Sequence, residues 1–196
     1  MENYVFIAEK PSLMREVKAC YQKHREEINH AVGTIDFTAL AGHVCRYMEP
    51  DEYGDWSEAW ESISYPMIPK QWGIVPIKGK EAILETIRQL AQVHDGIIVG
   101  TDSDTEGYGI YYLLEAYLGL SGKKALRFLE HSLTDKEILA SLLSMTDFHT
   151  DPVHRRFTQS YLLRAQADWL YGMNATRAAT CSTGRLMTIR LIGMAT

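Results

Sequence analysis

The stretch that decides the fold covers residues 97–107 and reads Ile97-Ile98-Val99-Gly100-Thr101-Asp102-Ser103-Asp104-Thr105-Glu106-Gly107. Its first four residues are apolar or small, which is typical of a buried strand. Carboxylates then follow at alternate positions, and a glycine stands where a helix should begin. Alternate positions of an extended turn lie on one side, and carboxylates on one side suit hard cations such as Mg²⁺. Because Mg²⁺ commonly assists phosphoryl transfer, the stretch predicts a metal site that works on phosphate esters.

Outward from this stretch, strand patterns alternate with helix patterns. Strands are expected at 4–8, 34–41, 44–48, 97–100 and 124–129, and helices at 11–23, 79–93, 107–118 and 134–145. This alternation predicts an α/β fold, in which a mainly parallel sheet carries helices on both faces. From Pro152 onward the pattern is helical. We therefore expect one α/β domain over residues 1–150 and the start of a helical domain over residues 151–196.

Between the third and fourth expected strands lies a segment rich in tryptophan, tyrosine and proline. This aromatic segment, residues 49–72, contains Tyr53, Trp56, Trp60, Tyr65, Pro66, Pro69 and Trp72. A loop of this length inside a compact domain is usually functional. We expect it to be ordered and held by packing of its aromatic rings.

Composition indicates an ordinary globular protein. Of the 196 residues, 46% are hydrophobic and 23% are charged, and no apolar run approaches the roughly 20 residues that cross a bilayer. The N-terminus has no secretory pattern. The three cysteines, Cys20, Cys45 and Cys181, are far apart and lack a CxxC spacing. We expect reduced thiols in a cytoplasmic protein, without a disulfide framework or a zinc site.

Charge is distributed unevenly along the chain. Residues 151–196 contain six arginines and two aspartates, a balance of +4. Because the net charge of the whole chain is −5, residues 1–150 must carry −9. The arginines are Arg155, Arg156, Arg164, Arg177, Arg185 and Arg190. Such a basic tail suits a surface that contacts phosphates, although a solvated helix face has the same composition.

Another acidic residue, Glu9, lies outside the carboxylate cluster of residues 102–106. It ends the first expected strand and precedes Lys10. Parallel strands end at the same edge of a sheet, so Glu9 should lie near Asp102 and Asp104. Such an arrangement allows a division of labour. The aspartate cluster would hold Mg²⁺, Glu9 would act as a general acid or base, and Lys10 would meet a phosphate oxygen. The alternative is that Glu9 and Lys10 form an ordinary strand end.

Two other acidic motifs fit the stretch less well. An EF-hand calcium loop needs a glutamate at its twelfth position, which is Leu113 here, and an entering helix in place of a strand. Phosphatases of the haloacid dehalogenase type also place Asp-x-Asp after a strand. Their threonine falls one position later than Thr105, and their motif usually opens the chain.

Four motifs in order resemble type IA DNA topoisomerases, most closely the bacterial topoisomerase III branch. They are Phe6-Ile7-Ala8-Glu9-Lys10-Pro11-Ser12, Asp102-Ser103-Asp104-Thr105-Glu106-Gly107, Ala167-Asp168-Trp169-Leu170-Tyr171-Gly172-Met173-Asn174-Ala175-Thr176-Arg177 and Ser182-Thr183-Gly184-Arg185-Leu186-Met187-Thr188. The first two resemble the motifs of the Toprim domain, and the third resembles the opening of the helical DNA-binding domain. The resemblance covers essentially the whole chain.

The resemblance implies a role for each matching residue. Asp102, Asp104 and Glu106 would bind Mg²⁺. Glu9 would be the catalytic glutamate near the scissile phosphate, and Lys10 would be the lysine next to it. Four residues would contact single-stranded DNA: Arg164, Asp168, Arg177 and Arg185. The family's nucleophilic tyrosine belongs to a later domain. The chain is therefore expected to be the N-terminal part of such an enzyme and to need the remainder as its partner.

Several positions depart from the family pattern. The acidic motif usually carries arginine and a further glutamate or glutamine where this chain has Thr105 and Tyr108. Gln166 replaces a frequent arginine, and Ile189 replaces a proline. Tyr65 precedes a proline as the family's nucleophile does, but no arginine follows that proline. We therefore interpret Tyr65 as a packing residue.

Two other functions remain open at this stage. A free-standing Toprim nuclease would use Mg²⁺ and Glu9 to activate water and would hydrolyse DNA without a tyrosine. A catalytically silent DNA-binding module would bind DNA without needing a metal. The helical pattern after residue 152 favours the topoisomerase, because a nuclease has no need of that helix.

Overall fold

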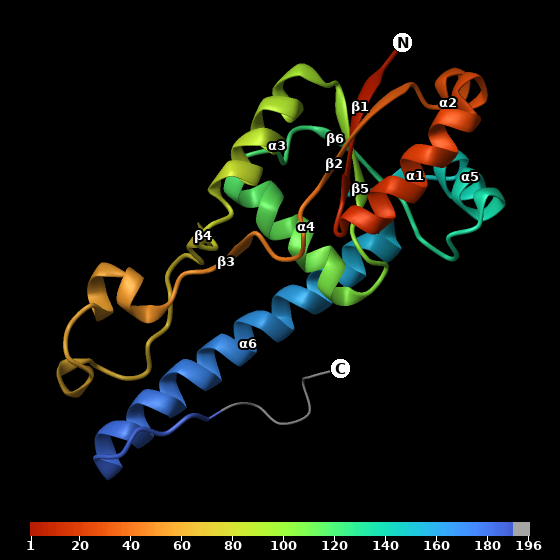
Figure 1. The fold of residues 1–196 in the computed structure, drawn as a ribbon. Helices are drawn as coiled ribbons and strands as arrows, with labels where there is room; N and C mark the ends of the chain where they lie inside the picture. Colours follow the sequence, from red (N-terminus) through yellow and green to blue (C-terminus); the bar gives the residue numbers. More distant parts are fainter. Residues whose placement is uncertain (190–196) are drawn as a thin grey trace.

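A computed structural model describes residues 1–189 and contains one central five-stranded sheet (Figure 1). The strand order is β2-β1-β5-β6-β7. The bounds are β1 Asn3–Ala8, β2 Thr34–Ala39, β5 Gly96–Gly100, β6 Lys124–Arg127 and β7 Thr146–Asp147. The first four strands pair in parallel, and β7 is antiparallel to β6. The α/β fold with a mainly parallel sheet is therefore confirmed.

Helices cover both faces of this sheet and enclose two apolar cores. One face carries α1 (Pro11–Lys23), α2 (Arg25–Ala31) and α5 (Asp135–Leu143). The opposite face carries α3 (Glu81–Val93) and α4 (Thr105–Leu118). Side chains of β1 alternate between the two cores, with Val5 and Ile7 on one side and Tyr4 and Phe6 on the other. Both faces of the sheet are buried, as expected for parallel strands connected by helices.

The second and third expected strands belong to two different sheets. After β2 the backbone turns at Ala41 (φ 54°) and Gly42 (φ 86°), both in the left-handed region. This turn carries the chain out of the main sheet into β3 (Cys45–Tyr47), which pairs antiparallel with β4 (Ile74–Pro76). The sequence did not predict β4, α2 or β7. Each of the three is short, so its pattern offers little signal.

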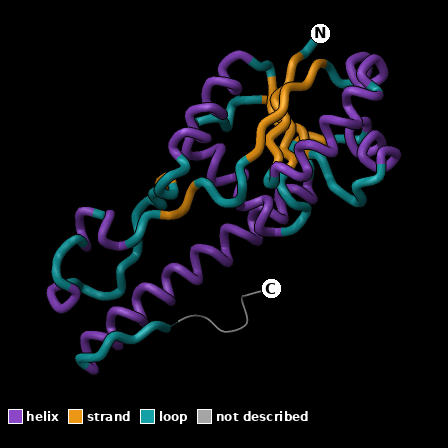
Figure 2. The backbone as a smooth tube through the Cα atoms, viewed as in Figure 1, coloured by secondary structure: helices purple, strands orange, loops and turns teal. Residues whose placement is uncertain are grey.

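The aromatic segment extends away from the sheet and lies beside the long helix α6 (Pro152–Thr183) (Figures 1 and 2). It contains three 3₁₀ turns, Pro50–Glu52, Gly54–Trp56 and Trp60–Ser62. Trp169 of α6 packs edge-on against Trp72, with ring centroids 5.4 Å apart, and its Nε1 donates to the Met48 carbonyl at 2.8 Å. The expected ordering by aromatic packing is confirmed.

Helix α6 starts where the sequence predicts and packs closely against α4. Asp151 caps its first turn by accepting from the Val153 N–H, and Pro152 occupies the first turn. At the crossing, a Cβ on Gly109 would lie 2.2 Å from the Tyr161 ring, so only glycine permits this approach. The domain boundary near residue 150 stays a prediction. No helix among residues 1–189 is long and apolar enough to cross a membrane.

Candidate active site

Glu9, Lys10 and Asp102 meet at the carboxyl edge of the sheet. Strands β1 and β5 are parallel neighbours in which Ala8 pairs with Gly100, so the residues after both strands emerge side by side. The Asp102 N–H donates to Glu9 Oε2 at 3.0 Å, and Lys10 Nζ donates to Asp102 Oδ2. Lys10 Nζ also lies 3.9 Å from Glu9 Oε1. The predicted proximity of Glu9 to Asp102 is therefore confirmed, while its proximity to Asp104 and the roles of these residues stay predictions.

The acidic loop, residues 101–106, leads from β5 into the first turn of α4, which contains Thr105 and Glu106. Asp104 Oδ1 accepts the Gly107 N–H at 2.8 Å and caps the helix, so α4 begins at Thr105 and not at Gly107. A Cβ on Gly107 would lie 2.1 Å from the Asp102 carbonyl oxygen. The glycine therefore lets the loop fold back tightly over the helix N-terminus. Capping occupies one carboxylate oxygen of Asp104 and leaves the other for a ligand.

Glu106 faces two basic side chains from distant parts of the chain. Arg164 of α6 donates to Glu106 Oε2, and His43 Nε2 lies 3.3 Å from Oε1. Together with Lys10 on Asp102, this arrangement places a basic group on two of the three carboxylates of the acidic loop. Lys10 and Arg164 therefore offset part of the negative charge of the acidic loop.

The donor set of the acidic loop suits Mg²⁺ in its chemistry. All candidate ligands are carboxylate oxygens, and the side chains of Asp102 and Glu106 are 31% and 41% exposed. The three carboxylates do not converge on one point. Within residues 1–189, three or more ligand atoms of Asp, Glu, His or Cys lie within 4.8 Å of one another only at Cys20, His24 and Asp135. Mg²⁺ usually takes one or two carboxylates plus waters, so the donor set fits without such convergence. The assignment of Asp102, Asp104 and Glu106 as ligands stays a prediction.

A buried arginine that the sequence analysis missed holds the acidic loop from beneath. Arg127, at the end of β6, is 1% exposed. Its Nη1 donates to the carbonyls of Val99 and Thr101 at 2.8 and 2.9 Å, and its Nη2 donates to the Asp102 carbonyl at 2.6 Å. Burial lowers the pKa of this guanidinium, which still has donors for several carbonyls at once. A single arginine inside the apolar run Ala125-Leu126-Arg127-Phe128 was the available signal.

Tyr108, one of the departures from the family pattern, belongs to the same buried network. Its ring lies under Arg127, whose guanidinium carbon is 4.5 Å from the ring centroid. The Tyr108 hydroxyl lies 2.8 Å from His154 Nδ1, and Thr146 Oγ1 lies 2.8 Å from His154 Nε2. Burial lowers the pKa of His154. The network joins the acidic loop to β7 and to the first turn of α6.

Most of the sheet, its covering helices and the acidic loop fall within the range of a known domain. A family model described as the Toprim domain matches residues 4–143, which include Glu9, Lys10, the acidic loop and Arg127. The chain belongs to the Toprim family. Helix α6, which carries Arg164, begins beyond the residues matched by this model.

Relatives extend the similarity of this Toprim chain into α6. The chain is 32% identical over 180 residues to DNA topoisomerase 3 of Vibrio cholerae, and 30% identical over 179 residues to that of Haemophilus influenzae. It is 28% identical over 197 residues to DNA topoisomerase 3 of Bacillus subtilis. These alignments cover 90–96% of this chain, but the chain spans only 26–28% of the length of these relatives. The Toprim chain is therefore homologous to one part of these topoisomerases.

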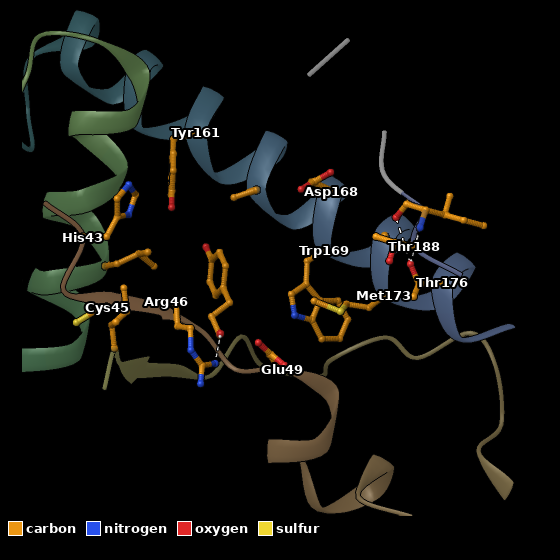
Figure 3. Close-up of a pocket in the computed structure, with 16 residues that line it drawn as sticks. His43, Cys45, Arg46, Glu49, Tyr161, Asp168, Trp169, Met173, Thr176 and Thr188 are labelled. Atoms are coloured by element: carbon orange, nitrogen blue, oxygen red, sulfur yellow. Dashed lines mark hydrogen bonds between the residues drawn. The ribbon is translucent and has the colours of Figure 1, made fainter. Parts of the chain in front are cut away.

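Between α6 and the part of the Toprim domain around β3 lies a groove of about 600 Å³ (Figure 3). Asp168, His43 and Arg46 line it, together with Thr176 and Thr188. Asp168 is exposed on α6, where the sequence predicts a contact with single-stranded DNA. Trp169 is 7% exposed and supports the groove as a core residue.

The predicted DNA-contacting arginines lie in three different settings. Arg164 lies at the acidic loop, and Arg185 is exposed just beyond the end of α6. Arg177 is 4% exposed: its Nη2 donates to Asp51 Oδ1 at 2.8 Å, and its guanidinium carbon is 4.8 Å from the Trp60 ring centroid. In this arrangement Arg177 anchors the aromatic segment to α6. Its role as a phosphate contact stays a prediction, and Arg190 lies outside the described residues.

Proposed function

We propose that this Toprim chain provides the metal-binding and acid–base part of a type IA DNA topoisomerase. One observation carries the proposal: Glu9 and Lys10, the acidic loop, and Arg164 of α6 come together at one edge of the sheet. Similarity to DNA topoisomerase 3 over 90% of the chain supports it. The nucleophilic tyrosine would come from another segment of the enzyme, which is the expected partner of this chain.

Each residue at this edge has a role in the proposed reaction. A tyrosine attacks a phosphodiester of single-stranded DNA, which forms a 5′-phosphotyrosyl link and releases a 3′-hydroxyl. Glu9 would give a proton to the departing 3′-oxygen and take it back when the strand is rejoined. Lys10 and Arg164 hold the phosphate oxygens by exchanging their carboxylate partners for phosphate.

A bound Mg²⁺ would add charge stabilisation for the phosphate oxygens. Asp102 and Asp104 would be its first ligands, because both belong to the loop whose Asp102 N–H contacts Glu9, and capping uses only one oxygen of Asp104. Glu106 becomes available as a ligand when Arg164 turns to DNA. In this proposal the binding of metal and the binding of phosphate favour each other. Phosphate draws Lys10 and Arg164 away from Asp102 and Glu106, which frees these carboxylates for metal, and metal on the carboxylates frees the two basic side chains for phosphate.

Incubation of the chain with end-labelled single-stranded DNA separates this function from the two alternatives. With Mg²⁺ the DNA should stay intact on a denaturing gel, because the chain supplies no nucleophilic tyrosine. Cleavage that requires both Mg²⁺ and Glu9, absent in a Glu9→Gln variant, would identify a nuclease. Binding of DNA with unchanged affinity when Mg²⁺ is removed would favour the silent module.

Fluorescence anisotropy with single-stranded DNA tests the contribution of α6. An Arg164→Gln variant should bind more weakly than the wild type and should show a smaller dependence on salt, because one phosphate contact is lost. Arg25→Gln, on α2 at the opposite face of the sheet, is the matched control with the same loss of charge. Equal weakening by both variants would contradict a specific contact at Arg164.

A further inference from the structure

Away from the acidic loop, three metal-ligating side chains of different kinds meet between α1 and α5. Their ligand atoms, Cys20 Sγ, His24 Nε2 and an Asp135 carboxylate oxygen, all lie within 4.8 Å of one another. Cys20 and His24 are four residues apart, so they project from the same side of α1 and its C-cap. Asp135 occupies the first turn of α5, which Thr134 caps by accepting the Glu137 N–H.

The nitrogen and oxygen of this cluster lie slightly closer together than two ligands of a tetrahedral ion, and the sulfur lies within 4.8 Å of both. Zinc bonds of about 2.3 Å to sulfur and about 2.0–2.1 Å to nitrogen or oxygen give ligand–ligand separations of roughly 3.4–3.6 Å. His24 Nε2 and Asp135 Oδ2 are 2.9 Å apart, and Cys20 Sγ donates to the Asp135 carbonyl at 3.5 Å. An ion therefore requires the His24 and Asp135 side chains to separate by only some tenths of an ångström and the thiol to turn towards them.

The charges of the cluster also match a divalent cation. A thiolate, a neutral imidazole and a carboxylate sum to −2, which one divalent ion neutralises. Lys23 Nζ shares Asp135 Oδ2 at 2.7 Å, but its side chain is 63% exposed and can move into solvent without leaving a buried charge. Exposure of the Asp135 and His24 side chains, 42% and 24%, gives the ion a path from solvent.

We propose that Cys20, His24 and Asp135 form a binding site for a divalent transition-metal ion of the zinc class, with water as the fourth ligand. Sulfur and nitrogen donors select such ions over Mg²⁺, which prefers oxygen ligands only. The site is separate from the acidic loop and clamps α1, which begins directly after Lys10, to α5. Binding converts the Cys20 thiol to a thiolate and releases its proton to the buffer.

The same contacts without an ion would be a hydrogen-bonded ion-pair network of Asp135 with His24 and Lys23. The two arrangements differ in one respect: only the metal site uses the Cys20 sulfur as a ligand. A test must therefore report on a bond between metal and sulfur.

Titration of the 196-residue chain with Co²⁺ provides that report through the thiolate-to-cobalt charge-transfer absorption in the near ultraviolet. We expect the band to saturate at one equivalent, to disappear on addition of Zn²⁺, and to be absent in Cys20→Ser. Cys45→Ser, at the other buried free cysteine, is the matched control and should keep the band. The acidic loop offers only oxygen atoms, so ions bound there do not produce it.

A second variant separates loss of a metal ligand from misfolding of Cys20→Ser. His24→Gln changes a half-buried side chain, retains the thiol and should weaken Co²⁺ binding while circular dichroism stays native. Zn²⁺ should also raise the thermal midpoint of the wild type and leave that of both variants unchanged, because the ion binds only the folded site. Absence of the band in the wild type, or its persistence in Cys20→Ser, would overturn the proposal.

Discussion

Replacement of Arg127 by methionine should destabilise the fold and loosen the acidic loop. Methionine keeps an unbranched apolar stem but removes the guanidinium and its donors. The Val99 carbonyl retains the Phe128 N–H as a partner, so the main loss falls on the carbonyls of Thr101 and Asp102. These two carbonyls hold the loop that carries the predicted metal ligands.

The magnitude follows from the buried groups that lose a partner. Each buried carbonyl left without a donor costs about 1–3 kcal/mol. Burying methionine in place of a guanidinium avoids the desolvation of a charge and offsets part of this cost. We expect a net loss of about 3 kcal/mol of unfolding free energy, which for a chain of this size lowers the thermal midpoint by roughly 6–12 °C.

Urea denaturation and calorimetry measure this loss directly. Arg88→Met is the matched control, because Arg88 is 42% exposed and pairs with Glu85 on the surface of α3. That control should cost less than about 1 kcal/mol. If Arg127→Met were as stable as Arg88→Met, the guanidinium would not be what holds the loop in place.

Three further predictions concern other parts of the fold. Gly107→Ala should cost at least about 2 kcal/mol, because its Cβ would lie 2.1 Å from a backbone oxygen, whereas Gly122→Ala, with nothing within 4 Å, should be close to neutral in chemical denaturation. Asn174→Leu removes both amide hydrogen bonds to the Met67 backbone, so limited proteolysis should cut the aromatic segment faster; an unchanged rate would contradict this anchoring. His154 has a lowered pKa in the folded state, so unfolding free energy should decrease as pH falls below about 6.5, and His154→Gln should flatten that dependence.

Local sequence signals were sufficient for the elements that lead into the candidate site. Hydrophobic patterning identified β1 and β5, and their parallel pairing places Glu9 beside Asp102 without further information. Pro11 and Thr134 marked the starts of α1 and α5 correctly, because both act through local backbone chemistry. The beginning of α4 was expected two residues too late, since the capping role of Asp104 was overlooked in favour of metal binding.

Long-range contacts lay beyond the reach of local patterns. Nothing near Arg127 in the sequence indicates that its guanidinium reaches three carbonyls on a neighbouring strand and loop. The motif around Arg177 gives no sign of its contact with Asp51, which lies 126 residues away. The cluster of Cys20, His24 and Asp135 is likewise invisible to cysteine spacing, because Asp135 belongs to a distant helix.

The most direct test of the proposed function is DNA relaxation by a chimeric enzyme. This chain would replace the matching part of the Vibrio cholerae DNA topoisomerase 3, which supplies the rest of the enzyme. We predict Mg²⁺-dependent relaxation of negatively supercoiled DNA, which Glu9→Gln in the chimera should abolish while DNA binding is retained. A folded chimera that binds single-stranded DNA but never relaxes supercoils would contradict the account, as would full activity in the Glu9→Gln chimera.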